Sequence, residues 1–158
     1  MDLPSKLFKY IPKEIRKNAK LNKQRAVPYS LYSTIEKRMA YAQDILNLYR
    51  DEASLVITSA LHCAQPCIAM GIPVIFIDPE ESSERFSTLR GIIPIYTKED
   101  LIHKRIDFYN VTVPNIEYLK KLMIENLKLS IEQIKGNKNN DNITNLQNIR
   151  TNIASFKA

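Results

Sequence analysis

Thr58, Ser59 and His62 are the residues of this chain whose types and spacing could do chemistry together. They follow a short apolar run, residues 55–57, and His62 falls in the first turn of a predicted helix. A helix N-terminus offers free N–H groups and the positive end of the helix dipole, which favour an anion. A histidine there can donate or accept a proton near neutral pH. The pattern would suit a small-anion site, with proton transfer at His62 and hydrogen bonds from Thr58 and Ser59.

Two alternatives compete for His62. On residue chemistry alone, a structural histidine, half-buried and hydrogen-bonded to a loop, is the simpler interpretation. Metal binding is the other, because Cys63 and Cys67 lie close by. However, His62 and Cys63 point about 100° apart on a helix, and no fourth ligand follows at zinc-site spacing. The sequence predicts no metal and two core thiols.

Residues 54–78 must position these side chains. Two continuous apolar runs, 55–57 and 73–77, flank a segment long enough for a helix. This pattern predicts a strand–helix–strand unit with buried, parallel strands and a right-handed crossover. Ser59 is predicted to cap the helix and Gly71 to end it. Open parallel sheets bind ligands at the carboxyl ends of their strands, and the Thr58–Ser59 turn lies at such an end.

Amphipathic helices are predicted on both sides of this unit. The first covers residues 33–50 and begins at an S-x-x-E capping box, and the second covers 115–134. Residues 92–95 contain Pro94, so a strand there should be short or lie at an edge. The predicted fold class is α/β, a small parallel sheet with flanking helices. So small a sheet indicates one of two things: further strands lie in segments interpreted here as helix or loop, or the chain pairs with another chain or a second copy.

Charge and composition divide the chain further. Residues 1–26 hold eight basic and two acidic residues, which account for the whole net charge of +6. We predict a basic helical lead-in over 1–32, an α/β lobe over 33–135 and an Asn/Lys-rich tail over 136–158. The tail should be largely disordered, with at most a frayed helix over 143–155.

The same composition narrows the function classes. Solvated lysines are the simpler interpretation of the basic lead-in, so no nucleic-acid partner is predicted; steeply salt-dependent DNA binding would indicate the opposite. No apolar run approaches the roughly 20 residues that span a bilayer, so no transmembrane segment is predicted. The N-terminus has no apolar core of signal-peptide type. A cytoplasmic location is expected.

Residues 56–78, VITSALHCAQPCIAMGIPVIFID, resemble the signature of the polysaccharide pyruvyl transferase family. Its members carry an apolar strand, then T-[SD]-R-L-H, small residues, an alanine–glycine pair and a P-V-I strand. The helix around Arg38, the R-F-x-x-L segment that begins at Arg85 and the stretch after Asn110 are also similar, so the resemblance covers about residues 33–130. One departure is Ala60, which stands where the family has an arginine and removes an anion contact.

The resemblance implies a fold and an activity. Family members resemble two-domain GT-B glycosyltransferases, and this chain would supply a Rossmann-like C-terminal lobe, the other lobe coming from a second chain or a second copy. The family's reaction moves pyruvate from phosphoenolpyruvate onto two hydroxyls of a sugar in surface polysaccharide biosynthesis, without a further cofactor. By the resemblance, His62 is catalytic, and Thr58, Ser59 and Arg85 bind the small anionic donor next to a glycan acceptor.

Two other functions stay open, so the sequence does not decide whether the chain is an enzyme. A GT-B glycosyltransferase would use a nucleotide sugar, and the fold suits either donor. A catalytically silent binding module would lack the partner lobe and the arginine replaced by Ala60. Arg85 has its own alternative, an ion pair with Glu81 or Glu84 that closes the loop.

Overall fold

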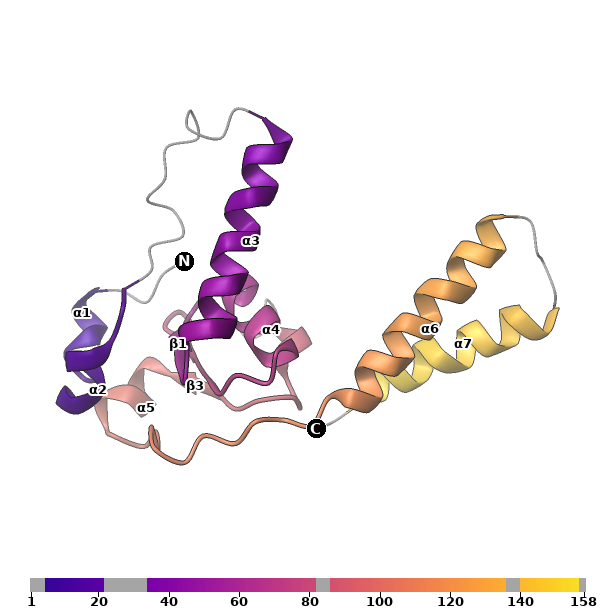
Figure 1. The fold of residues 1–158 in the computed structure, drawn as a ribbon. Coiled ribbons are helices and arrows are strands. Elements are labelled where there is room, and N and C mark those ends of the chain that lie inside the picture. Colours follow the sequence, from indigo (N-terminus) through magenta and orange to yellow (C-terminus); the bar gives the residue numbers. More distant parts are fainter. Residues whose placement is uncertain (1–4, 22–33, 82–85, 136–139, 157–158) are drawn as a thin grey trace. The chain divides into compact units, whose positions relative to one another are not determined.

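The chain folds into two compact units, Met1–Val113 and Pro114–Ala158 (Figure 1). The first holds a small sheet with helices, and the second is a pair of helices. The computed structural model describes residues 5–21, 34–81, 86–135 and 140–156.

A parallel sheet forms the centre of the first unit. Its strands are β1 (Val56–Thr58), β2 (Val74–Asp78) and β3 (Ile95–Thr97), in the order β1-β2-β3. Helix α4 (Leu61–Ala69) connects β1 to β2. Thr58 pairs with Phe76, and Asp78 pairs with Thr97, so the carboxyl ends of all three strands share one edge. The predicted α/β class and its strand–helix–strand unit are confirmed.

Strand β2 is central and completely buried. Because side chains alternate along a strand, Ile75 and Ile77 point to one face of the sheet, where they join a cluster with Leu7 and Ile11. Helix α5 (Lys98–Ile102) adds Leu101 to that cluster. The N-terminal segment, with helices α1 (Ser5–Phe8) and α2 (Lys13–Asn18), therefore covers part of the sheet through the apolar residues around α1.

The other face of β2 packs against α4. This helix contacts β1 and β2 and buries Cys63, Ala64, Cys67 and Ile68. Phe76 points to the same side and meets Phe86 edge-on, with the ring centroids 4.8 Å apart. Leu89, in the short 3-10 helix η2 (Ser87–Leu89), is also fully buried. Helices thus flank both faces of β2, which explains its uninterrupted apolar sequence.

The ends of α4 differ in part from the prediction. Gly71 follows the helix with φ +76°, and its N–H and that of Ile72 bond back to the last turn, so the predicted stop is confirmed. The N-cap, however, is Ala60 and not Ser59, and no side chain caps the helix. The prediction of Ser59 as cap was wrong because the chain stays extended for one residue more before the helix begins.

Helix α3 (Ile35–Glu52) is the predicted first amphipathic helix, shifted by two residues. Thr34 is its N-cap and accepts a hydrogen bond from the Lys37 N–H, so the cap lies one residue after the predicted one. Only the C-terminal half of its apolar stripe is covered: Tyr49 is buried, whereas Ile35 and Met39 are exposed. The predicted helix is confirmed, and its first turns keep their apolar side chains exposed.

Strand β3 begins directly after Pro94, later than the predicted run over 92–95. Proline has no N–H to donate, so the ladder starts at Ile95. The predicted edge position is confirmed, because β3 pairs only with β2 among the described strands.

The second unit consists of α6 (Glu117–Ile134) and α7 (Asn140–Ser155), which pack against each other. Leu122 of α6 and Leu146 and Ile149 of α7 are buried, whereas Met123 and Leu127 are exposed. A helix therefore occupies most of the tail for which the sequence predicts disorder, because apolar residues at helical spacing in α7 find a partner in α6. In the described parts of the chain, no helix has both the length and the apolar character to cross a membrane.

Candidate functional site

Buried polar side chains gather at one edge of the sheet. Among the described residues, Thr58, Ser59 and Asp78 are the polar or charged residues that the fold buries. Thr58 ends β1, Ser59 follows it, and Asp78 ends β2. Burying polar groups costs free energy unless they are hydrogen-bonded, so their gathering at the carboxyl ends of the strands marks this edge as the candidate site.

The turn after β1 presents the N-terminus of α4. The Thr58 hydroxyl oxygen accepts a hydrogen bond from the Ala60 N–H at 3.0 Å and so holds the turn. The Ala60 carbonyl accepts from the N–H groups of Cys63 and Ala64. The first helical N–H groups, those of Leu61 and His62, have no acceptor within the helix. An alanine N-cap leaves the positive end of the helix dipole open to an anion.

His62 is the second residue of α4 and is exposed. Within the described residues its side chain makes no hydrogen bond or ion pair with another residue. The alternative of a half-buried histidine bonded to a loop does not fit this position. Arg85, the fourth residue predicted for the site, lies outside the described residues.

The two cysteines are core residues. Cys63 and Cys67 are buried thiols that form no disulfide. A hydrogen bond with Cys63, together with burial, raises the pKa of the Cys67 thiol above its ordinary value, so the thiol stays protonated. No group of three metal-ligating side chains occurs among the residues that the structure describes. The thiols therefore pack α4 against the sheet.

A pocket of about 500 Å³ opens at the same edge, beside β2 and β3. Its polar walls are Asp78, Glu81, Arg90 and Thr97, and its apolar walls include Phe86, Ile93 and Ile95. None of the predicted residues Thr58, Ser59 and His62 lines it. The pocket and the α4 N-terminus are thus neighbouring features of one sheet edge, β2 lying between β1 and β3.

The backbone at the pocket is unusual at two positions. Glu81 has φ +53° and Gly91 has φ +79°. Glycine adopts this region freely, whereas another residue loses about 1–2 kcal/mol there. The turn after β2 therefore holds the Glu81 side chain at the pocket in spite of local strain. Sequence reasoning missed Asp78 and Arg90; an acidic residue directly after a buried apolar strand was the available signal for Asp78.

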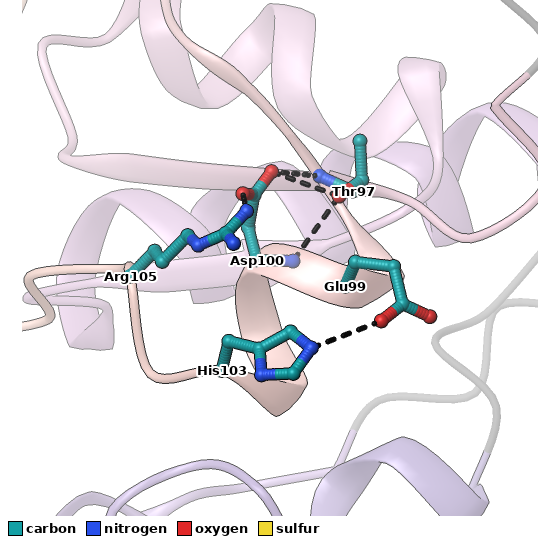
Figure 2. Close-up of polar contacts among 5 residues, drawn as sticks. All are labelled: Thr97, Glu99, Asp100, His103 and Arg105. Carbon is teal, nitrogen blue, oxygen red and sulfur yellow. Dashed lines mark hydrogen bonds and ion pairs between the residues drawn. The ribbon is translucent and has the colours of Figure 1, made fainter.

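A capping box fixes the last pocket wall, Thr97 (Figure 2). The Thr97 hydroxyl oxygen accepts from the Asp100 N–H at 3.1 Å. In return, an Asp100 carboxylate oxygen accepts from the Thr97 N–H at 2.9 Å and from its hydroxyl at 2.8 Å. These bonds from Thr97, and more weakly the Arg105 guanidinium, lower the pKa of Asp100 below its ordinary 3.8. The box begins α5 at the end of β3 and orients Thr97.

Asp100→Ala should lower the free energy of unfolding by about 1 kcal/mol at neutral pH, because the reciprocal bonds of the box are lost. Since the folded pKa of Asp100 is below 3.8, its contribution is complete above that pH and is lost as the pH falls through the lower, folded value. Urea unfolding at several pH values should show the difference from wild type shrinking in acid. Glu99→Ala, an exposed acid on the same helix, is the control, and a pH-independent difference would contradict the assignment.

The model of the family described as "Polysaccharide pyruvyl transferase" matches residues 2–81, just over half of the 158 residues. The match includes β1, α4 and β2 and also the basic lead-in, which the sequence resemblance left out. Neither the curated proteins nor the solved structures gave a match.

Proposed function

Because the chain belongs to the polysaccharide pyruvyl transferase family, we propose that it binds phosphoenolpyruvate and passes its pyruvyl group to a glycan in surface polysaccharide biosynthesis. One observation carries the proposal. The uncapped N-terminus of α4 stands at the carboxyl edge of a parallel sheet, with His62 exposed in its first turn. Thr58 and Ser59 are buried directly before it.

The chemistry of the donor suits this arrangement. Phosphoenolpyruvate carries a carboxylate and a phosphate, and the free N–H groups of α4 attract such anions. In ketal formation, two sugar hydroxyls bond to the enol carbon and phosphate leaves. One hydroxyl proton ends on the methylene carbon, and the other leaves with phosphate. His62, at hydrogen-bonding reach of an anion held by the helix, would move these protons as general acid and base, and no cofactor is needed.

The proposal includes a setting for the site. The first unit would serve as the donor-binding, Rossmann-like lobe of a GT-B-type enzyme in the cytoplasm. A facing lobe would come from another chain or a second copy. The family match and the parallel sheet support this arrangement, since ligands of such folds lie at the carboxyl ends of the strands.

A thermal-shift titration tests the donor. Phosphoenolpyruvate should raise the melting midpoint of the full chain, because a ligand at a hundred times its Kd stabilises the folded state by about 2.7 kcal/mol. Inorganic phosphate is the control for general anion effects. Ala60→Arg restores the arginine of the family pattern and should strengthen phosphoenolpyruvate binding through a charge-assisted bond. A midpoint unchanged by phosphoenolpyruvate in both proteins would overturn the proposed donor.

Glycosyl transfer from a nucleotide sugar is the second candidate, and Ala60 favours it, because an anion contact of the pyruvyl pattern is missing. Nucleotide sugars in the same titration discriminate the two. A shift with a nucleotide sugar alone would assign glycosyl transfer. A cooperative melt with no shift by any donor would assign a silent binding module.

A further inference from the structure

The pocket beside β2 and β3 is not explained by the donor site. Its volume of about 500 Å³ lies within the range of about 300–1,000 Å³ usual for small-molecule sites. His62, Thr58 and Ser59 do not line it. A second ligand therefore has a place at the same edge of the sheet.

The charges of the pocket indicate what kind of ligand fits. Among the described residues that line it, Asp78 and Glu81 bring two carboxylates and Arg90 one guanidinium. The carboxylates repel a ligand that carries both a carboxylate and a phosphate. Sugar hydroxyls, in contrast, donate hydrogen bonds to carboxylates, and an arginine donates to sugar oxygens. With two carboxylates and one guanidinium, the pocket favours a neutral polyhydroxyl ligand over the anionic donor, phosphoenolpyruvate.

Asp78 is the most buried polar residue of this pocket. It ends the most buried strand and is itself 4% exposed, so its position is fixed by the sheet. One of its carboxylate oxygens accepts from the Glu80 N–H at 3.1 Å, which holds the turn. A carboxylate has about four lone-pair sites, so this bond leaves acceptor capacity for a ligand hydroxyl.

The apolar walls complete the fit. Ile93, Ile95 and Phe86 line the pocket, and Phe86 is held by its edge-on contact with Phe76. A pyranose ring is amphipathic, with C–H groups on its faces and hydroxyls around its rim. A pocket with apolar walls and a few fixed polar groups matches such a ring.

We propose that this pocket binds the acceptor, a neutral sugar residue with free neighbouring hydroxyls, through Asp78, Glu81 and Arg90. The inference rests on the proposed function, which requires an acceptor next to the donor. Adjacent strands lie about 4.8 Å apart, so the α4 N-terminus and the pocket are close enough for the two substrates to meet at one edge.

Amide NMR shifts of the full chain test the proposal, with methyl β-D-galactopyranoside, methyl α-D-mannopyranoside and phosphoenolpyruvate as separate probes. At least one glycoside should move the amide signals of Asp78, Gly91 and Thr97. Phosphoenolpyruvate should move those of Ser59 and His62 instead. Because the glycosides and phosphoenolpyruvate should move the signals of different residues, the spectra distinguish a missing sugar site from a missing donor site.

Matched variants sharpen the assignment. Asp78→Asn keeps an oxygen to accept from the Glu80 N–H, and Glu81→Gln keeps the shape of its side chain. Each should weaken glycoside binding at least fivefold and leave phosphoenolpyruvate binding unchanged. Glu80→Gln makes the same charge change at an exposed residue that does not line the pocket, and it should have no effect.

Two results would overturn the inference. In the first, neither glycoside moves a pocket amide at saturating concentration. In the second, phosphoenolpyruvate moves the pocket amides and Arg90→Gln abolishes that shift, which would assign the pocket to the donor. Glycoside binding without any phosphoenolpyruvate response would contradict the proposed donor site and leave the sugar pocket standing.

Discussion

His62→Ala should weaken phosphoenolpyruvate binding at least tenfold and leave the protein folded. A hydrogen bond to a charged group contributes about 1.5–3 kcal/mol, and each 1.4 kcal/mol is about tenfold in Kd. The fold should tolerate the change, since His62 is exposed and alanine is a good helix former. The melting midpoint of wild type and variant is measured over a titration with phosphoenolpyruvate. The midpoint without ligand reports whether the variant is folded, and its rise with ligand gives the Kd.

The second histidine of the chain is a matched control. His103 follows α5, is exposed and pairs with Glu99 at 3.3 Å (Figure 2). His103→Ala should bind phosphoenolpyruvate as wild type does. If the folded His62→Ala protein binds the donor with unchanged affinity, His62 does not belong to the site.

Phe76→Ala should cost about 3–5 kcal/mol of stability, the largest loss expected from one substitution in the first unit. Phe76 is 0% exposed, lies at the middle of the central strand and packs edge-on against Phe86. The loss approaches the lower end of the stability of a typical domain, about 5–15 kcal/mol, and so small a sheet belongs at that end; the variant should therefore be partly unfolded at room temperature. Urea unfolding followed by circular dichroism measures the change.

An exposed aromatic in the same unit is the control for Phe76. Tyr109 is 67% exposed, and Tyr109→Ala should change stability by no more than about 0.5 kcal/mol. A loss below about 1 kcal/mol for Phe76→Ala would show that the sheet is not the stabilising centre of this unit.

Local patterns made the sheet and its helix predictable. The runs at 55–57 and 73–77 are apolar without alternation, which is the pattern of strands covered on both faces, and β2 is covered in this way. Gly71 is a reliable stop because few other residues adopt its positive φ without strain. The family was recognisable from the same residues, since the motif around His62 coincides with the strand–helix turn.

Long-range packing explains what the sequence did not show. The apolar stripe predicted helix α3 but not which part of it is covered, and Ile35 and Met39 are exposed in the described chain. Helix α7 forms because it packs on α6, a contact that the composition of the tail did not indicate. Likewise, Asp78 and Arg90 line one pocket only in the folded chain, a juxtaposition that no local pattern indicates.

The position of β2 between two shorter strands also sets the order in which the sheet opens. Its amides are held on both sides by ladder partners, whereas β3 is three residues long and only half-buried. Hydrogen exchange should therefore be slowest in β2 and faster in β3 at Ile95 and Tyr96, which precede the Thr97 N–H that the capping box protects. The pocket wall formed by β2 therefore stays folded, whereas the wall formed by β3 opens locally. A bound ligand would slow amide exchange in β3 far more than in β2.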